Sequence, residues 1–135
     1  MKEERCVLII NPSLAPGKTA NAAAVMALTV GQRHPHLVGP ALTDGSGLSW
    51  PGLIPTGIPV LSATPAVLST LLSSVLSQNF DVVIFPEQGQ MTTDYAAFSA
   101  AVAEVTTDAL PLLGIAVTGE KKALRKFTAG LSLFA

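Results

Sequence analysis

Cys6-Val7-Leu8-Ile9-Ile10 decides the fold, together with the residues that follow it. A continuous apolar run of this kind is typical of a central strand that is covered on both faces. The segment from Asn11 to Pro16 then turns the chain, because each Pro disfavours helical geometry in the residue before it. An alanine-rich helix is predicted from Lys18 to Val30, ending at Gly31. A strand, a turn and a helix in this order predict an α/β domain.

The rest of the chain continues the alternation of strands and helices. A segment rich in Gly and Pro runs from Gln32 to Pro59, and its Asp44-Gly45 pair is a hairpin signal between short strands. Further strands are predicted at 58–62, 81–85 and 112–117, and further helices at 65–78, 92–105 and 120–129, with a short extended tail at 131–134. We therefore expect one domain over residues 1–135, with three α/β/α layers and a small mixed, mostly parallel sheet.

Two packing expectations follow from the sequence. The first helix carries a face of small side chains at helical spacing, namely Ala20, Ala23, Ala24, Ala27 and Leu28. Such a face allows close approach to a sheet, and we expect this helix to be buried nearly all round. Trp50 is the only tryptophan, and we expect it to fill part of the core.

The composition is that of a domain with few charges. Apolar residues make up 49% of the chain and charged residues 13%, with a net charge of -1. A small monomer with so few charges exposes apolar patches, so we expect a homodimer. The sequence contains neither an apolar stretch of the roughly 18 residues that a membrane span needs nor the apolar core of a signal peptide. We therefore predict a cytoplasmic location and no membrane partner. Cys6 is expected to be a buried strand thiol.

Positive charge is concentrated in the last predicted helix. Lys121 with Arg125 and Lys122 with Lys126 form two stripes at i,i+4 spacing. Both a solvated face and a face that contacts phosphate fit this pattern. A net charge of -1 does not indicate a dedicated nucleic-acid binder, but these stripes leave nucleic acid open as a partner.

Two short motifs carry candidate chemistry. Gly17-Lys18-Thr19 follows a strand, but Pro12 stands where a phosphate loop needs a glycine, so the sequence excludes that motif. Lys18 at a helix N-terminus is either a solvated side chain or a site that attracts an anion. His34 and His36 form a His-x-His pair without a third ligand nearby in sequence. We therefore predict no metal site and no cofactor.

Two separated stretches resemble the type II peptidyl-tRNA hydrolases. The first is the opening strand with Leu14-Ala15-Pro16-Gly17-Lys18 and the alanine-rich helix. The second is Leu113-Gly114-Ile115-Ala116, followed by Lys126-Phe127-Thr128 and Leu131-Ser132-Leu133-Phe134. Most of the chain also resembles the domain of unknown function 2000 family, which shares that fold. The matching residues are Asn21-Ala22-Ala23-Ala24-Val25, Leu37-Val38-Gly39-Pro40, Gln90, Asp94-Tyr95 and Gly119-Glu120-Lys121-Lys122-Ala123.

The resemblance implies a hydrolase that acts on an ester or amide of a nucleotide-bearing substrate. In this hypothesis Lys18 binds an anion and Asp94 is the base. The expected binding residues are Asn11, Asn21, Gln90, Thr118, Lys121 and Lys122. The hydrolases carry a second Lys, a Gln and a His near the first helix, and an Asp-Ala-Gly-x-Thr-Gln segment, all of which this chain lacks. A non-catalytic module that binds a small ligand or a protein therefore stays open as the alternative.

Overall fold

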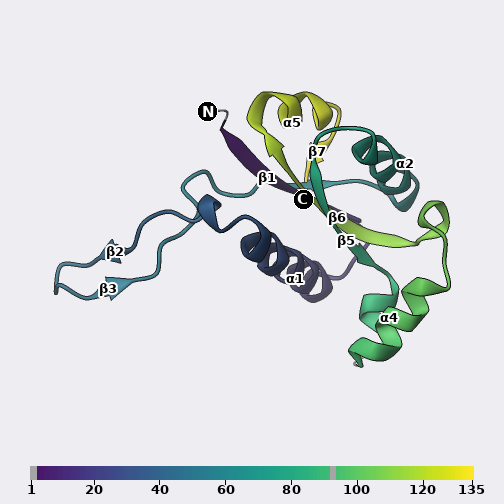
Figure 1. Cartoon of the computed structure of the whole chain (residues 1–135), viewed down its shortest axis with the longest axis horizontal. Helices are drawn as coiled ribbons and strands as arrows, with labels where there is room; N and C mark the ends of the chain where they lie inside the picture. Colours follow the sequence, from purple (N-terminus) through teal and green to yellow (C-terminus); the bar gives the residue numbers. More distant parts are fainter. Residues whose placement is uncertain (1–2, 92–93) are drawn as a thin grey trace.

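The chain folds around a five-stranded sheet (Figure 1). The structure is a computed structural model that describes residues 3–91 and 94–135, with only the backbone of residues 90 and 91. The strand order is β5-β6-β1-β4-β7. In chain order, the strands are β1 (Glu4–Ile10), β4 (Val60–Ser62), β5 (Asp81–Pro86), β6 (Leu112–Glu120) and β7 (Ser132–Leu133).

The sheet is mixed, as predicted, but mostly antiparallel. Among the described strands of this sheet, only β1 and β4 pair in parallel, whereas β1 with β6, β5 with β6, and β4 with β7 are antiparallel. The prediction of a mostly parallel sheet was therefore wrong. A continuous apolar run indicates that a strand is buried on both faces, but it does not indicate the direction of its neighbours. The central strands β1 and β6 are both buried and run in opposite directions.

Helices pack on both faces of the sheet. α1 (Pro16–Arg33) packs on one face, where Ala22, Met26 and Val30 join strand residues such as Cys6 and Leu8 in one hydrophobic cluster. On the other face, α2 (Pro65–Leu76) and α5 (Lys121–Phe127) cover a second cluster around Ile9, Ile115 and Val117. Cys6 is 1% exposed, which confirms the expected buried thiol.

The face that α1 turns to the sheet differs from the predicted one. Ala22, Met26 and Val30 are buried at i,i+4 spacing, whereas Leu28 of the predicted small face is 79% exposed. The helix also continues past Gly31 and ends before Pro35, which disfavours helical geometry at His34. The larger Met26 and Val30 side chains fill the space above the sheet better than alanines do. The expectation of burial all round was therefore wrong.

The remaining helices largely follow the sequence. Thr64 is the N-cap of α2 as predicted, and its hydroxyl accepts a hydrogen bond from the Val67 amide. After β5 come α3 (Gln88–Met91), α4 (Tyr95–Ala103) and the 3-10 turn η2 (Thr107–Ala109). A second 3-10 turn, η1 (Pro35–Leu37), follows α1. Among the described residues, no helix has the length and apolar character that a membrane crossing requires.

A hairpin arm extends from the body of the molecule (Figure 1). It consists of residues 38–55, and its strands β2 (Leu42–Thr43) and β3 (Ser49–Trp50) pair antiparallel on either side of a turn that begins at Asp44. The Trp50 side chain is 53% exposed, and its indole N–H donates to the Asp44 carboxylate at 3.0 Å. The expectation that Trp50 fills the core was wrong, because this tryptophan stabilises the turn of an exposed hairpin instead.

Candidate functional site

A cleft lies between α1, β5 and α4, and we call it the α1–α4 cleft. Its volume is about 490 Å³, which is within the range of small-molecule sites. α1 contributes Asn21, Val25, Met26 and Thr29, β5 contributes Val83 to Pro86, and the following segments contribute Gly89, Asp94, Tyr95 and Phe98.

Helix periodicity and the sheet edge create this cleft. Asn21, Val25 and Thr29 follow one another at i,i+4 spacing, one residue before the buried row of α1. They therefore form a stripe beside the face that packs on the sheet. β5 is an edge strand, and its residues 81–84 are only partly buried. The open edge of the sheet and this stripe of α1 form two walls of the cleft.

The α4 side of the cleft consists of a capped helix start and two aromatic rings. The Asp94 carboxylate caps α4 by accepting a hydrogen bond from the Ala96 amide at 3.0 Å. The rings of Tyr95 and Phe98 meet edge to face, with centroids 5.7 Å apart. The cleft therefore combines apolar and aromatic walls with a few polar groups, the usual composition of a ligand site.

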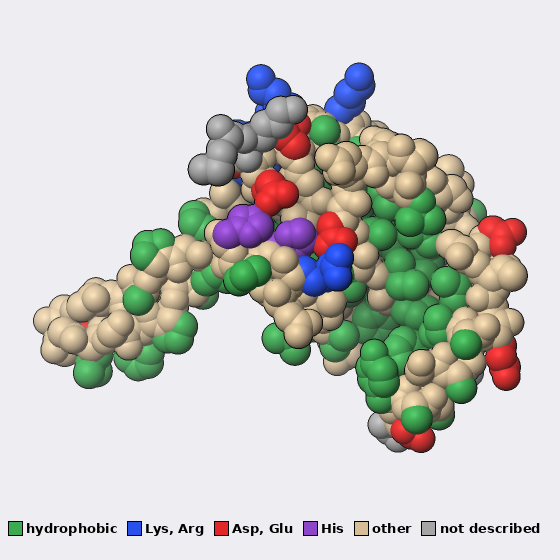
Figure 2. Space-filling model, viewed as in Figure 1, with side chains coloured by type: hydrophobic (Ala, Val, Ile, Leu, Met, Phe, Trp, Pro, Cys, Tyr) green, Lys and Arg blue, Asp and Glu red, His purple; other side chains and the backbone are tan. Residues whose placement is uncertain are grey.

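A second, shallower groove continues the cleft along β5. It has a volume of about 380 Å³ and shares Thr29, Val83, Ile84, Tyr95 and Phe98 with the α1–α4 cleft. Figure 2 shows hydrophobic side chains gathered between the sheet and α4. The apolar surface available to a ligand therefore extends beyond the cleft itself.

Some of the predicted site residues lie at this cleft. Asn21 and Asp94 line it. Lys18 is exposed in the first turn of α1, three residues before Asn21 and therefore on the same side of the helix. The Asn11 side chain accepts a hydrogen bond from the Ser13 amide at 3.0 Å, which stabilises the turn before α1. The Gln90 side chain is outside the described residues.

The other predicted binding residues lie at the opposite end of the sheet. Thr118 is buried on β6, near the C-terminal end of α1. The helical rise places that end roughly 24 Å from Lys18. Lys121 lies 3.7 Å from the Glu3 carboxylate, and Lys122 is exposed on α5. Burial raises the pKa of the Cys6 thiol, and a hydrogen bond with Thr118 partly offsets that rise. Thr118, Lys121 and Lys122 therefore do not join Asn21 and Asp94.

A cluster of potential metal ligands lies at that same end, where the sequence indicated the two histidines without a third ligand. Glu4, His34 and His36 each place one ligand atom within 4.8 Å of the others. Next to them, Arg33 donates two hydrogen bonds to Asp81, at 2.7 and 2.8 Å. These bonds, with a smaller contribution from His34, lower the pKa of Asp81 to about 2 despite its partial burial. Glu4 is 30 residues before His34, so no spacing in the sequence indicated this cluster.

Comparisons with known proteins give a family and a fold. Residues 4–135 match the family described as "Protein of unknown function (DUF2000)". The chain belongs to this family. A search of curated proteins finds no match.

The chain is similar in structure to Atu0240, a protein of unknown function from Agrobacterium tumefaciens strain C58, with 21% sequence identity and a TM-score of 0.90 over 100% of both chains. At this identity the likeness shows the fold alone. It supports a mixed α/β fold for this DUF2000 member and carries no information on activity.

Proposed function

We propose that this DUF2000 chain binds a small ligand, with an apolar body and a polar end, in the α1–α4 cleft. The observation that carries the proposal is the cleft itself, about 490 Å³ with apolar walls from three elements and polar groups from Asn21, Thr29 and Asp94. Val25, 48% exposed, and Tyr95, 79% exposed, are apolar or aromatic surface that a ligand would remove from water.

The charge of the cleft indicates which polar groups a ligand should carry. Among the described lining residues, Asp94 is the one charged side chain. An amide or hydroxyl donor on the ligand would pair with the Asp94 carboxylate, and the Asn21 amide offers both a donor and an acceptor. Lys18, one helical turn away, is placed to attract an anionic group on a longer ligand.

Hydrolysis of a bound ester or amide is the second candidate function. It is supported by Asp94 and Asn21 in one cleft with Lys18 one turn away, and by the resemblance to type II peptidyl-tRNA hydrolases. Helices on both faces of the sheet fit the three-layer arrangement that the resemblance implies. Hydrolysis needs a group that activates water and a group that stabilises the oxyanion. Asp94 would supply the first and Lys18 the second, on a nucleotide-bearing substrate.

Saturation-transfer NMR with a library of aromatic amides, esters and nucleosides tests the binding proposal. We expect some of these ligands to bind the wild type. Their affinity for Val25→Lys should be at least about tenfold lower, because the charged side chain would lie in the apolar wall of the cleft. Leu28→Lys is the matched control, since Leu28 is on the same helix, 79% exposed, and outside the cleft lining. Equal loss in both variants, or the same affinity in Val25→Lys as in the wild type, would contradict a site in the cleft.

Release of tRNA from a peptidyl-tRNA substrate tests the hydrolase candidate. We expect turnover by the wild type and a rate at least about 100-fold lower in Asp94→Asn and Lys18→Ala, since each substitution removes one of the two required groups. Glu104→Gln, an exposed carboxylate at the end of α4, is the control for nonspecific loss of charge. A wild-type rate no higher than that of buffer would exclude this activity and leave ligand binding as the function.

A further inference from the structure

A second cavity lies at the C-terminal end of α1, and we call it the histidine pocket. Its volume is about 900 Å³, and it shares no lining residue with the α1–α4 cleft. Its polar lining residues are Glu3, Glu4, His34, His36, Thr56, Asn79, Asp81, Thr118 and Glu120. Figure 2 shows the two histidines beside acidic side chains on one face of the molecule.

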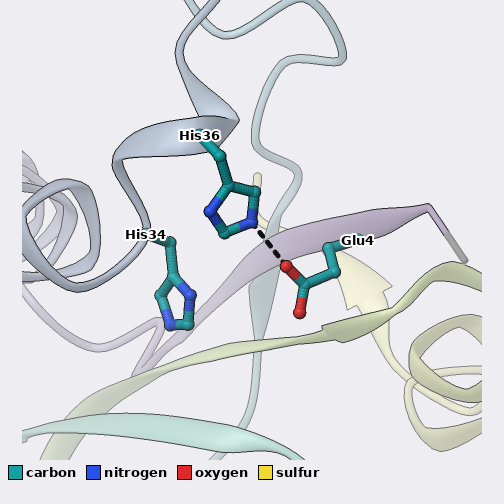
Figure 3. Close-up of side chains that lie close together, drawn as sticks. All are labelled: Glu4, His34 and His36. Carbon is teal, nitrogen blue, oxygen red and sulfur yellow. Dashed lines mark hydrogen bonds and ion pairs between the residues drawn. The ribbon is translucent and has the colours of Figure 1, made fainter. Parts of the chain in front are cut away.

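We propose that Glu4, His34 and His36 bind a divalent transition-metal ion of the zinc class. One ligand atom from each side chain lies within 4.8 Å of the others, and the His36 Nε2 atom is 2.5 Å from the Glu4 Oε1 atom. Figure 3 shows the His36 ring directed at the Glu4 carboxylate and the His34 ring beside them. A tetrahedral metal with bonds of about 2.1 Å holds its ligand atoms about 3.4 Å apart, so side-chain rotation would close the remaining gap.

The backbone brings these three side chains together. Glu4 is two residues before Cys6 on β1, so both point toward the face that α1 covers. α1 ends at Arg33, and Pro35 turns the chain into η1 directly above that face. His34 and His36 flank this proline, and the amide of Leu37 donates to the His34 carbonyl at 3.0 Å. The turn therefore places both imidazoles over the start of β1.

The chemistry of the ligand set selects the class of metal. Two imidazole nitrogens and one carboxylate suit zinc, cobalt, nickel and copper, whereas magnesium and calcium prefer oxygen ligands throughout. Three protein ligands leave a coordination position open to water or substrate. His36 is half exposed, with a side-chain exposure of 58%, so that position would face solvent.

A second layer of hydrogen bonds orients His34. Its Nε2 atom lies 2.7 Å from the Asp81 carboxylate, which leaves Nδ1 as the nitrogen on the side of Glu4 (Figure 3). Asp81 is itself held by the two hydrogen bonds from Arg33. A metal-binding histidine usually donates its other N–H to a carboxylate in this way, and the pairing fixes both the tautomer and the ring orientation.

The charge of the histidine pocket favours a cation. Its described lining includes the carboxylates of Glu3, Glu4, Asp81 and Glu120, and neither Lys nor Arg. Three cations pair with two of these carboxylates from outside the lining: Arg5 and Lys121 with Glu3, and Arg33 with Asp81. A divalent ion would add a favourable interaction with Glu4 and would replace its hydrogen bond to His36 with two metal bonds.

Isothermal titration of zinc chloride into chelator-treated full-length protein tests this proposal. We expect one equivalent to bind the wild type, and at least about tenfold weaker binding to His36→Ala and Glu4→Gln, because each variant loses one ligand. Glu104→Gln, which removes an exposed carboxylate on a different element, is the matched control and should bind like the wild type. Circular dichroism of each variant would verify that it folds.

Two outcomes would overturn the metal site. One is a wild type that takes up no zinc. The other is zinc binding that is equally tight in His36→Ala and Glu4→Gln, which would assign the ion to other surface groups. The visible absorption of the cobalt(II)-loaded protein gives a second readout, because imidazole ligation in a tetrahedral site changes the cobalt spectrum. We expect that spectrum in the wild type and in Glu104→Gln, and the spectrum of hydrated cobalt in His36→Ala.

Discussion

At the scale of single residues, Asp44 stabilises the turn of the hairpin arm. Its carboxylate accepts hydrogen bonds from the Trp50 indole and from the amides of Ser46 and Leu48. These bonds lower the pKa of Asp44 below its ordinary value of 3.8, with the Trp50 bond as the largest cause. Because the folded pKa lies below the unfolded one, the turn gains stability above the unfolded value and loses it as the pH falls through the folded value.

Acidification should therefore release the hairpin turn, and Trp50 fluorescence reports it because Trp50 is the only tryptophan. We expect a change in emission with a midpoint below pH 3.8 in the wild type. The change should be absent in Asp44→Asn, whose side chain does not titrate and keeps one acceptor oxygen for the amides of Ser46 and Leu48. Its NH₂ group takes the place of the oxygen that accepts from Trp50, so the emission of this variant is compared with itself across the pH range. A transition of the same midpoint in both proteins would instead indicate acid unfolding of the whole chain, which far-UV circular dichroism would detect.

Residue roles were predictable where a local rule decides them. Thr64 before Pro65 predicts an N-cap, and the structure confirms it. The potential metal ligands were only partly predictable. The sequence shows the pair of His34 and His36, but Glu4 reaches them through the packing of α1 on β1 and not through any sequence spacing. Trp50 was misplaced because the sequence shows the hairpin signal at Asp44 but not that the Trp50 indole donates to Asp44 across the turn.

At the scale of elements, most strands and helices were predictable from apolar runs and helical spacing. The direction of strand pairing was not, because burial on both faces produces the same apolar run in parallel and antiparallel central strands. The α1–α4 cleft was only partly predictable. Asn21 and Asp94 were both named as site residues, but the cleft also depends on β5 being the edge strand.

The base of the hairpin arm depends on close backbone contact at Gly52. A Cβ atom at Gly52 would lie 2.1 Å from the Gly39 carbonyl oxygen and 2.4 Å from that of Pro40. We expect Gly52→Ala to push apart the two segments that form the base of the arm. The rate of limited proteolysis within residues 38–55 should therefore increase. Gly45→Ala is the control, since nothing lies within 4 Å of a Cβ there and its φ is not positive. Equal proteolysis of both variants would contradict this role for Gly52.

At the scale of the whole molecule, the chain exposes more surface than a compact monomer. Its accessible surface is 8301 Å². A monomer of 13.9 kDa is expected to expose about 6,700 Å², so the excess is roughly 1,600 Å². The arm contributes to it with five apolar side chains that are about half exposed or more, namely Val38, Leu42, Leu48, Trp50 and Leu53. A standard interface buries about 800 Å² from each partner, so this excess is sufficient for one.

We therefore expect the chain to form a homodimer through the hairpin arm. Asp44 is the only charged residue between Val38 and Pro59, so the arm offers a second copy mainly apolar surface. Sedimentation equilibrium should give a dimer for the wild type and a monomer when Leu42 and Leu48 are both replaced by Ser. Leu76→Ser, at an apolar side chain 61% exposed on α2, should remain dimeric. A monomeric wild type, or a dimeric double variant, would contradict an interface at the arm.

The most direct test of a ligand site in the α1–α4 cleft is methyl NMR of the ¹³C-labelled chain during titration with the library hits. A ligand in the cleft should shift the methyl signals of Val25, Met26 and Val83, which line it. Leu61 and Leu68, in the hydrophobic cluster on the other face of the sheet, should not shift. Ligand-induced shifts elsewhere in the chain, with the signals of Val25, Met26 and Val83 unchanged, would contradict a ligand site in the α1–α4 cleft.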